Sequence, residues 1–301
     1  MKALLSMRAM LPMKAMLPMK AMLPMKGYQV RRLVGRVFFG LSVFALVSPA
    51  ILVFLWMLSL SLKNEVDNMS FVPVFIPNPP TLNNFVEVFE RNDFLTYTIN
   101  SVIVSFGATG LALLFGVPAG FGIAKARAHR VAALIMIARV TPGLSYLIPL
   151  FLLFQWIGLT GTLTPLLITH LVITVPIVVW VMIGFFEGLP SELEEAALVD
   201  GATIWQAFRH IALPLARPGI VVAMILAFIF SWNNFIFGVV LAGRATRTLP
   251  VAVYNVISFE QVSWGPLAAA ALLVTLPVLL LTLVMQKEIV AGLTAGGVKG
   301  G

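Results

Sequence analysis

Cysteine is absent from this 301-residue sequence, and charged residues make up only 11% of it. The absence of cysteine excludes disulfide frameworks and thiolate metal sites. Hydrophobic residues make up 60% of the chain, and its mean hydropathy is +1.00. This composition excludes an ordinary soluble domain and places the chain among membrane proteins.

The sequence also lacks a phosphate-binding glycine loop of the G-x-x-x-x-G-K-[ST] type, so any energy source must lie on another polypeptide. No cluster of catalytic side chains or chain of acidic residues lies in its apolar stretches, which disfavours a membrane enzyme and a proton-coupled transporter. The net charge of +8 does not indicate nucleic-acid binding, because the basic residues gather at the ends of apolar stretches. We therefore expect no covalent chemistry, metal or cofactor on this chain.

A hexapeptide repeat occupies much of residues 1–36, with MRAMLP at Met7 and MKAMLP at Met13 and Met19. Proline every six residues breaks any helix, and the period is too short for a solenoid. We interpret residues 1–36 as a basic, low-complexity cytoplasmic segment. It is either a loose membrane-surface anchor or a dispensable extension, and we favour the second.

Six apolar stretches follow, each near the roughly 20 residues that a bilayer requires. They predict an all-α membrane protein whose transmembrane domain covers 37–288, with spans at about 37–62, 96–124, 132–156, 165–186, 218–241 and 266–286. The third stretch is the least regular, because Arg139, Pro142 and Gly143 interrupt it. A buried helix is the alternative for one or two of the six.

Basic residues set the predicted orientation. Most of the 20 lysines and arginines precede the first span, follow the second, separate the fourth from the fifth, or follow the sixth. The other side holds only Lys63, Arg91, Arg244 and Arg247. The positive-inside rule then places both termini, the loop 191–214 and the tail 289–301 in the cytoplasm. In the external segment 63–95, TLNNFVEVF predicts a short amphipathic helix.

The loop SELEEAALVDGATIWQAFRHIALP, residues 191–214, predicts two short helices joined by a turn. Capping boxes fit at Ser191 with Glu194 and at Thr203 with Gln206. Gly201 lies where a reversal needs positive φ, and Pro214 is expected to stop the second helix. Ile204, Phe208 and Ile211 share one face by spacing. Because helices this short are marginal in water, that face needs a surface to dock on.

The same loop contains Glu195-Ala196-Ala197, three residues, Gly201, nine residues, Ile211, one residue, then Leu213-Pro214. This spacing matches the EAA motif, EAA-x3-G-x9-I-x-LP. The chain therefore resembles the membrane subunits of bacterial ABC importers.

That resemblance implies that the loop forms coupling helices, which dock into a groove of a separate ATP-hydrolysing subunit. Ala196 and Ala197 would permit close approach. The groove would be filled by Ile204, Trp205 and Phe208. Glu195 either contacts the ATPase or is merely solvated.

Further motifs resemble one subfamily. Trp232-Asn233-Asn234-Phe235 is similar to the W-N-x-F/Y signature of carbohydrate-type permeases. IVAGLTAGGVKG, from Ile289, resembles the closing GLTxGAVKG, with Gly297 in place of alanine. LNNFVEVF and Asn100-Ser101 are also similar. On these residues the chain is identified as a member of the carbohydrate-uptake, MalG-type family over residues 37–301.

The family implies an ATP-driven sugar importer in the bacterial cytoplasmic (inner) membrane, in which this chain forms half of the pathway. The implied partners are a homologous second permease, an ATPase dimer that binds ATP and Mg, an extracytoplasmic sugar-binding protein and membrane lipid. Two alternatives stay open. One is a secondary transporter or channel without an ATPase, and the other is an ABC permease for a non-sugar solute.

Polar residues within spans are costly, so they are candidates for the substrate pathway. The amides of Asn233 and Asn234 could bind sugar hydroxyls, and Trp232 and Phe235 could stack on a sugar ring. Interhelical hydrogen bonding and packing is the equal alternative for each. Arg139 faces either a cavity or a partner carboxylate. A lone histidine such as His170 in the fourth span is more often an interior residue than a proton relay.

Overall fold

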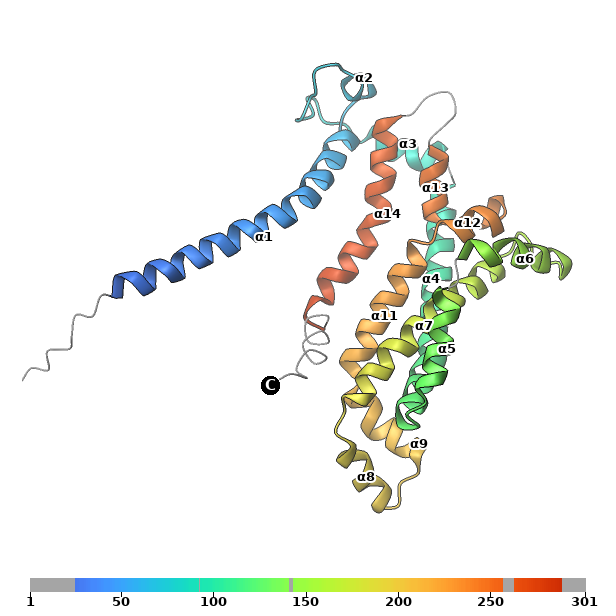
Figure 1. Cartoon of the computed structure of the whole chain (residues 1–301). Helices are drawn as coiled ribbons and strands as arrows, with labels where there is room; N and C mark the ends of the chain where they lie inside the picture. The colour runs from blue at the N-terminus through green and yellow to red at the C-terminus, as the bar shows by residue number, and fades with distance from the viewer. Residues whose placement is uncertain (1–24, 92, 141–142, 257–262, 289–301) are drawn as a thin grey trace, which may run out of the picture. The chain divides into compact units, whose positions relative to one another are not determined.

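The structure is a computed structural model that describes residues 25–91, 93–140, 143–256 and 263–288. All regular elements in this part of the chain are helices, as expected for the all-α class (Figure 1). The expectations for the repeat and for the C-terminal tail fall largely on residues 1–24 and 289–301, which lie outside the described residues.

Four helices are long and apolar enough to cross a membrane, namely α1 (Met25–Ser61), α4 (Phe94–Lys125), α7 (Thr164–Glu187) and α14 (Trp264–Val284). The apolar part of α1 begins at Val34. These helices confirm the spans that the sequence predicts at about 37–62, 96–124, 165–186 and 266–286, with ends that shift by a few residues.

The predicted span at 132–156 is divided, which corrects the expectation of one continuous helix. Its residues form α5 (His129–Val140) and α6 (Gly143–Trp156). α5 packs along α7, whereas α6 turns away toward α12 (Ile236–Leu241) (Figure 1). Pro142, one of the suspected interruptions, lies outside the described residues.

The predicted span at 218–241 is divided as well, into α11 (Arg217–Trp232) and α12. The two asparagines of the WNNF sequence cause the break. Asn233 ends α11, and the Oδ1 atom of Asn234 accepts a hydrogen bond from the Phe237 N–H at 3.2 Å. An asparagine side chain that binds a nearby backbone N–H starts a new helix instead of continuing the old one.

The chain forms two compact units, which meet within α1 between Phe54 and Leu55. In the first unit the apolar side chains of α1 are exposed, including Phe38, Phe44 and Leu46. A helix that is apolar all round suits lipid or another protein better than water.

Close packing of α4, α7 and α11 organises the second unit. Gly116 and Gly120 lie one turn apart on the face of α4 that meets α7. A Cβ added at Gly116 would lie 2.7 Å from Val178 Cγ1, and one at Gly120 would lie 2.7 Å from Met182 Cβ. Glycines at this spacing let two helix backbones approach, which is how van der Waals packing holds helices together in lipid.

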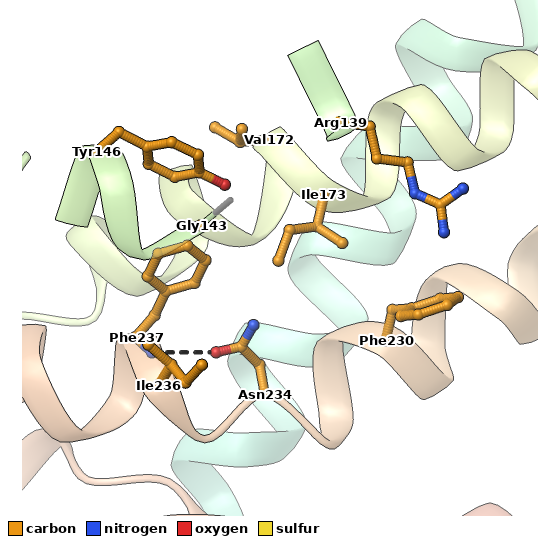
Figure 2. A pocket seen from close by; sticks show the side chains of 9 residues that line it. All are labelled: Arg139, Gly143, Tyr146, Val172, Ile173, Phe230, Asn234, Ile236 and Phe237. Carbon is orange, nitrogen blue, oxygen red and sulfur yellow. Dashed lines mark hydrogen bonds between the residues drawn. The ribbon is translucent and has the colours of Figure 1, made fainter. Parts of the chain in front are cut away.

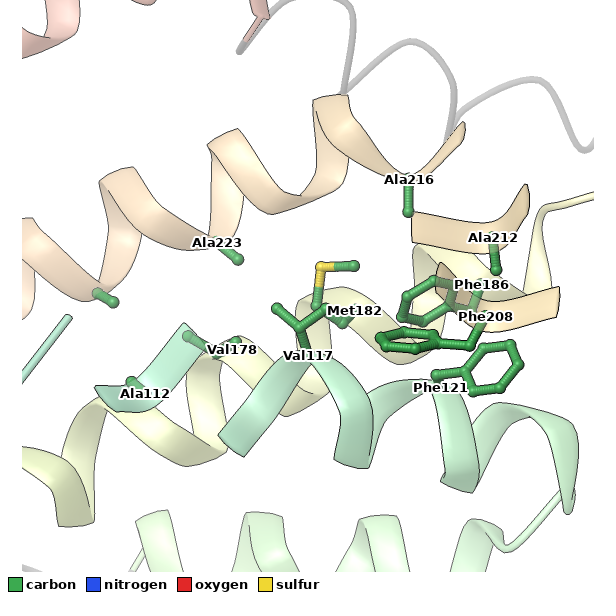
Figure 3. Close-up of a cluster of buried hydrophobic side chains, with 11 residues drawn as sticks. Ala112, Val117, Phe121, Val178, Met182, Phe186, Phe208, Ala212, Ala216 and Ala223 are labelled. Carbon is green, nitrogen blue, oxygen red and sulfur yellow. The ribbon is translucent and has the colours of Figure 1, made fainter. Parts of the chain in front are cut away.

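Figure 3 shows the buried side chains between these helices, which we call the central cluster. Its members come from α4, α7, α11 and the polar loop, and they are Ala112, Val117, Phe121, Val178, Met182, Phe186, Phe208, Ala212, Ala216, Ala223 and Ala227. The core of the membrane helices therefore continues into the loop.

Polar side chains fasten the opposite end of the second unit. α3 (Asn83–Arg91) confirms the amphipathic helix predicted from TLNNFVEVF. In it, Asn84 Nδ2 donates hydrogen bonds to the carbonyls of Ser61 at 2.9 Å and Lys63 at 2.7 Å. The carboxylate of Glu65, which begins α2 (Glu65–Asn68), accepts the backbone N–H groups of Trp264 and Gly265 at the start of α14. A carboxylate is favourable at a helix N-terminus.

The Asn100-Ser101 pair of α4 makes a similar attachment. Asn100 Nδ2 donates to Ala245 O at 3.0 Å, in the short helix η2 (Arg244–Thr246), and to Arg247 O at 2.9 Å. Ser101 Oγ accepts the Leu249 N–H at 2.7 Å, where α13 (Leu249–Val256) begins. Sequence analysis did not anticipate α13.

Candidate functional site

The polar loop between α7 and α11 folds into a helical hairpin, and we name residues 191–216 the hairpin segment. α8 (Ser191–Val199) turns into α9 (Ile204–Ala207), and a π-helix, η1 (Phe208–Ala212), and α10 (Leu213–Leu215) lead on to α11. Gly201 has a φ of +90° in the turn, which confirms the expected positive φ.

Only one of the two expected capping boxes forms. The Thr203 N–H donates to Gln206 Oε1 at 2.7 Å, and the Gln206 N–H donates to Thr203 Oγ1 at 3.2 Å. The box at Ser191 is wrong, because α8 starts at Ser191 after Pro190 with no side-chain cap. Glu194, its expected partner, instead forms an ion pair with Lys125.

Pro214 does not stop the second helix where the sequence predicts. The helical path runs through it to Leu215 and then bends by 76° into α11. The preceding turns are π-helical, and this wider winding leaves room for a proline ring that would clash with an α-helical turn. Pro214 thus lies just before the bend.

One end of the hairpin segment is buried, and we call this end, at Phe208, its root. Phe208 is only 4% exposed and packs against Phe121 and Phe186, with ring centroids 4.9 and 6.2 Å away. This corrects the expectation that Phe208 shares an outward face with Ile204 and Ile211. Phe208 begins η1, one helical turn along the chain from Ile204, and there its ring enters the central cluster (Figure 3). Spacing places two residues on one face of a helix but does not specify what each part of that face packs against.

The other end of the hairpin segment, around Ile204 and Trp205, is apolar and exposed, and we call it the tip. Ile204 and Trp205 are each 60% exposed, and Val199 is 87% exposed. The remaining motif residues vary in exposure, with Glu195, Ala196 and Pro214 exposed and Ala197, Ile211 and Leu213 half-buried. Exposed apolar residues gathered at one tip indicate a surface for another protein.

An ion pair joins the first arm of the hairpin segment to the membrane helices. Lys125 Nζ, at the end of α4, lies 2.8 Å from Glu194 Oε2, and Glu194 is 7% exposed. A cavity of about 590 Å³ lies beside this pair, lined by residues that include Arg127, Glu187 and Glu195. α8 is thereby tied to α4 by charge, while η1 is tied to it by packing.

A second cavity, of about 220 Å³, lies where both interrupted spans meet α7, and we name it the pathway cavity (Figure 2). Its lining residues are Arg139, Gly143, Tyr146, Val172, Ile173, Phe230, Asn234, Ile236 and Phe237. The guanidinium of Arg139 lies over the Phe230 ring, 5.3 Å from its centroid. Arg139 therefore lies at a cavity, which is one of the two surroundings expected for it; the other, a carboxylate of a partner, belongs to a second chain.

Of the four WNNF residues, only Asn234 lines the pathway cavity. Trp232 is 2% exposed, stacks on Phe228 and donates from Nε1 to Val274 O at 2.9 Å. Of the two alternatives for Trp232, these contacts favour interhelical bonding and packing over stacking on a sugar ring. Asn233 Nδ2 donates to Ile229 O at 3.0 Å, and the Phe235 ring lies against Tyr254.

The remaining polar candidate is His170, which is buried in α7. Its Nδ1 atom lies 2.7 Å from Ser231 Oγ on α11, so it links two helices. Its Nε2 atom has no hydrogen-bond partner within the described residues. In the same part of the chain, no group of His, Asp and Glu side chains is placed to hold a metal ion.

Sequence reasoning missed several residues that the structure brings to these two places. Lys125 was counted only as a topology charge, although its position at the end of a span beside an acidic loop is a usable signal. Tyr146, Phe230 and Phe237 are ordinary aromatic residues within apolar stretches. Their place in one cavity depends on how separate helices pack, so no local pattern marks them.

The similarity to known proteins covers both the hairpin segment and the pathway cavity. Residues 112–293 match the family model described as the binding-protein-dependent transport system inner membrane component. That range includes the hairpin segment and every residue that lines the pathway cavity.

Named relatives match most of the chain. The trehalose transport system permease protein SugB of Mycobacterium tuberculosis is 36% identical over 262 residues, which is 84% of this chain and 94% of that protein. The sulfoquinovosyl glycerol transport system permease protein SmoH of Agrobacterium fabrum is 32% identical over 251 residues, 82% of this chain and 88% of that protein.

Among solved structures, the fold is shared with a chain of a bacterial ABC transporter involved in the import of the acidic polysaccharide alginate. The TM-score is 0.68 at 20% sequence identity, and the alignment covers 86% of this chain and 96% of that chain.

Proposed function

This chain belongs to the family of binding-protein-dependent transport system inner membrane components, as a permease subunit of an ABC importer, and we propose that its cargo is a carbohydrate. The relatives named for trehalose and for sulfoquinovosyl glycerol support a sugar. The chain is a transport subunit and not an enzyme. It acts in a complex with an ATPase and a binding protein, and ATP and Mg²⁺ are assigned to the ATPase.

The membrane topology of this proposal has six crossings with both termini in the cytoplasm. Four crossings are the long helices, and the divided pairs α5 with α6 and α11 with α12 supply the other two. The distribution of basic residues supports the orientation. A homologous second permease, which the resemblance to the family implies, would complete the pathway.

Coupling to the ATPase is best supported by the contrast between the exposed tip and the buried root of the hairpin segment. Its tip presents Ile204 and Trp205 to the outside, while Phe208 holds its root in the central cluster. In the proposed complex the tip docks in a groove of the ATPase, in the helix-in-groove manner. Glu195 is exposed beside the tip and is assigned to a cationic group of that groove.

Movement would pass from this tip into the membrane. When the ATPase dimer closes on ATP, the docked tip is displaced, and Phe208 carries the displacement to α4 and α7. The bend before α11 carries it along α11 to the break at Asn233, beside the pathway cavity. Inward-open and outward-open states then exchange population under the influence of ATP and of the loaded binding protein.

The test is a Trp205→Glu variant of the permease, purified with its partner subunits. We expect the ATPase to be lost from the purified complex and ATP-driven sugar uptake into proteoliposomes to stop. Phe71→Glu is the matched control, because Phe71 is a fully exposed aromatic in the external segment, and it should retain the ATPase. Sugar uptake by Trp205→Glu without any bound ATPase would contradict the proposal and favour a secondary transporter.

A further inference from the structure

The pathway cavity contains a fixed positive charge without a counter-charge. Arg139 is the one charged residue among the described residues that line it, and no aspartate or glutamate is among them. Arginine remains protonated in proteins, so this charge is permanent. A cation held in a mostly apolar cavity attracts an anion strongly, because few other groups there can solvate it.

The other polar groups of the cavity are hydrogen-bond donors. Asn234 Oδ1 already accepts the Phe237 N–H, so the orientation of its amide is fixed and Nδ2 is left to donate (Figure 2). The Tyr146 hydroxyl lies beside Gly143, where an added Cβ would be 3.5 Å away from it. The guanidinium suits an oxyanion, while the amide NH₂ and the phenolic O–H lie toward the other end of the cavity and suit sugar hydroxyls (Figure 2).

The remaining lining suits the body of a sugar. The rings of Tyr146 and Phe237 lie 6.0 Å apart at one end, and Phe230 lies beneath Arg139 at the other. Aromatic rings pack against the apolar C–H face of a pyranose. The volume of about 220 Å³ is below the roughly 300–1,000 Å³ of pockets that enclose a drug-sized ligand, so the cavity holds one end of the substrate.

We propose that the imported carbohydrate is acidic, and that Arg139 binds its carboxylate or other oxyanion during passage. The guanidinium offers two parallel N–H groups to the oxyanion, while Asn234 Nδ2 and the Tyr146 hydroxyl, toward the other end of the cavity, bind hydroxyls of the same sugar. This inference rests on the proposed carbohydrate import and adds the charge of the substrate to it. A carboxylate of the second permease is the competing partner for Arg139.

The experiment uses cells of the source organism from which the gene has been deleted and then restored as wild type or as a variant. Uptake is measured for matched labelled pairs, cellobiose with cellobiouronic acid and trehalose with trehalose 6-phosphate. Within each pair one sugar is neutral and the other is an anion. Comparison of the two anions distinguishes transport of a carboxylate from transport of a phosphate. The variants are Arg139→Gln, which removes the charge, and Arg139→Lys, which keeps it. Arg130→Gln is the control, because Arg130 is exposed on the same helix and does not line the cavity.

We expect the restored wild type to import at least one acidic sugar faster than its neutral counterpart. Arg139→Gln should lower that uptake at least tenfold and leave assembly of the complex unchanged, whereas Arg139→Lys should keep a substantial part of the uptake and Arg130→Gln all of it.

Import of neutral sugars only, or equal uptake by Arg139→Gln and the wild type, would overturn the inference and leave sugar import standing. Loss of the second permease from Arg139→Gln complexes would overturn it in favour of the partner carboxylate. If deletion changes uptake of no sugar in the panel, both the carbohydrate proposal and this inference fail.

Discussion

The hairpin segment and the pathway cavity both lie where the apolar pattern of the chain is interrupted, but they are held by different forces. The hairpin segment is one continuous stretch, shaped by the turn at Gly201 and the cap at Thr203, with an aromatic root in the central cluster. The pathway cavity is assembled from α5, α6, α7, α11 and α12, and among its described lining residues a hydrogen bond joins Asn234 to Phe237. We expect the first to move as a unit and the second to change shape.

Helix α11 connects the two places. It begins at the 76° bend that follows the hairpin segment and ends at Asn233, next to the cavity. His170 and Ser231 attach its far end to α7. In the proposed mechanism, α11 carries movement of the docked tip to the pathway cavity. The following changes test this division, from the largest expected effect to the smallest.

Phe208→Ala should have the largest effect on stability. Removing a buried phenylalanine leaves a cavity and typically costs about 3–5 kcal/mol. We expect a lower melting temperature of the purified complex and loss of uptake. The contrasting change is Trp205→Ala at the exposed tip, which should lose the ATPase, whereas the variant permease prepared without the ATPase should melt within a degree or two of the wild-type permease prepared in the same way. If both variants melted alike, the distinction between root and tip would be wrong.

Gly201→Asp should disrupt docking while the spans still insert. At a φ of +90° with no atom within 4 Å, the added side chain meets strain and not a clash. A left-handed conformation costs a non-glycine residue about 1–2 kcal/mol, a shift of roughly 5- to 30-fold in the population of the native turn. Sugar-stimulated ATPase activity of the assembled complex is the measurement.

The matched control for this strain is Gly158→Asp. Gly158 also has a positive φ, +72°, and no atom within 4 Å, but it lies in the turn between α6 and α7. The two variants carry the same kind of backbone strain, one in the turn before α7 and the other in the turn between α8 and α9. Normal stimulated activity in Gly201→Asp, or equal loss in both variants, would speak against a docking role for the hairpin turn.

The same contrast explains what the sequence could predict. Four long spans, the positive φ of Gly201 and the Thr203 cap follow from local patterns, and the structure confirms them. The Ser191 cap failed because Lys125, 69 residues away along the chain, competes for Glu194. Phe208 was misassigned because periodicity places it on the same face as Ile204 but does not show that this part of the face packs on Phe121 and Phe186.

The cavity was harder to predict for a related reason. The WNNF sequence marks the place where α11 breaks, but four adjacent residues end up in four different surroundings. Arg139 was noticed because a charge within a span is costly, whereas Tyr146 and Phe237 have no such signal. Which aromatic residues line a cavity depends on how α6 and α12 pack, and hydrophobic periodicity does not specify that arrangement.

Breaking the ion pair between α8 and α4 should have a moderate effect. Lys125→Met removes one partner of Glu194, and because the Lys125 side chain is 36% exposed, we expect a cost of only about 1 kcal/mol. The charge exchange, Lys125→Glu with Glu194→Lys, should restore part of the loss. The coupling energy from this double-mutant cycle, measured by thermal unfolding of the complex, is the readout. A coupling energy of zero would mean that packing alone holds α8 in place.

A similarly small effect on stability is expected from Trp232→Phe, set against Asn234→Ala two residues along. Phenylalanine keeps most of the buried ring but loses the hydrogen bond from Nε1 to Val274 O, which is worth about 0.5–1.5 kcal/mol. The complex should melt slightly lower, with the KM for sugar uptake unchanged. Asn234→Ala should do the reverse, because its Nδ2 faces the pathway cavity: the KM rises, while the melting temperature shifts no more than in Trp232→Phe. An unchanged KM in Asn234→Ala, with a lowered melting temperature, would make the whole WNNF sequence a packing signature.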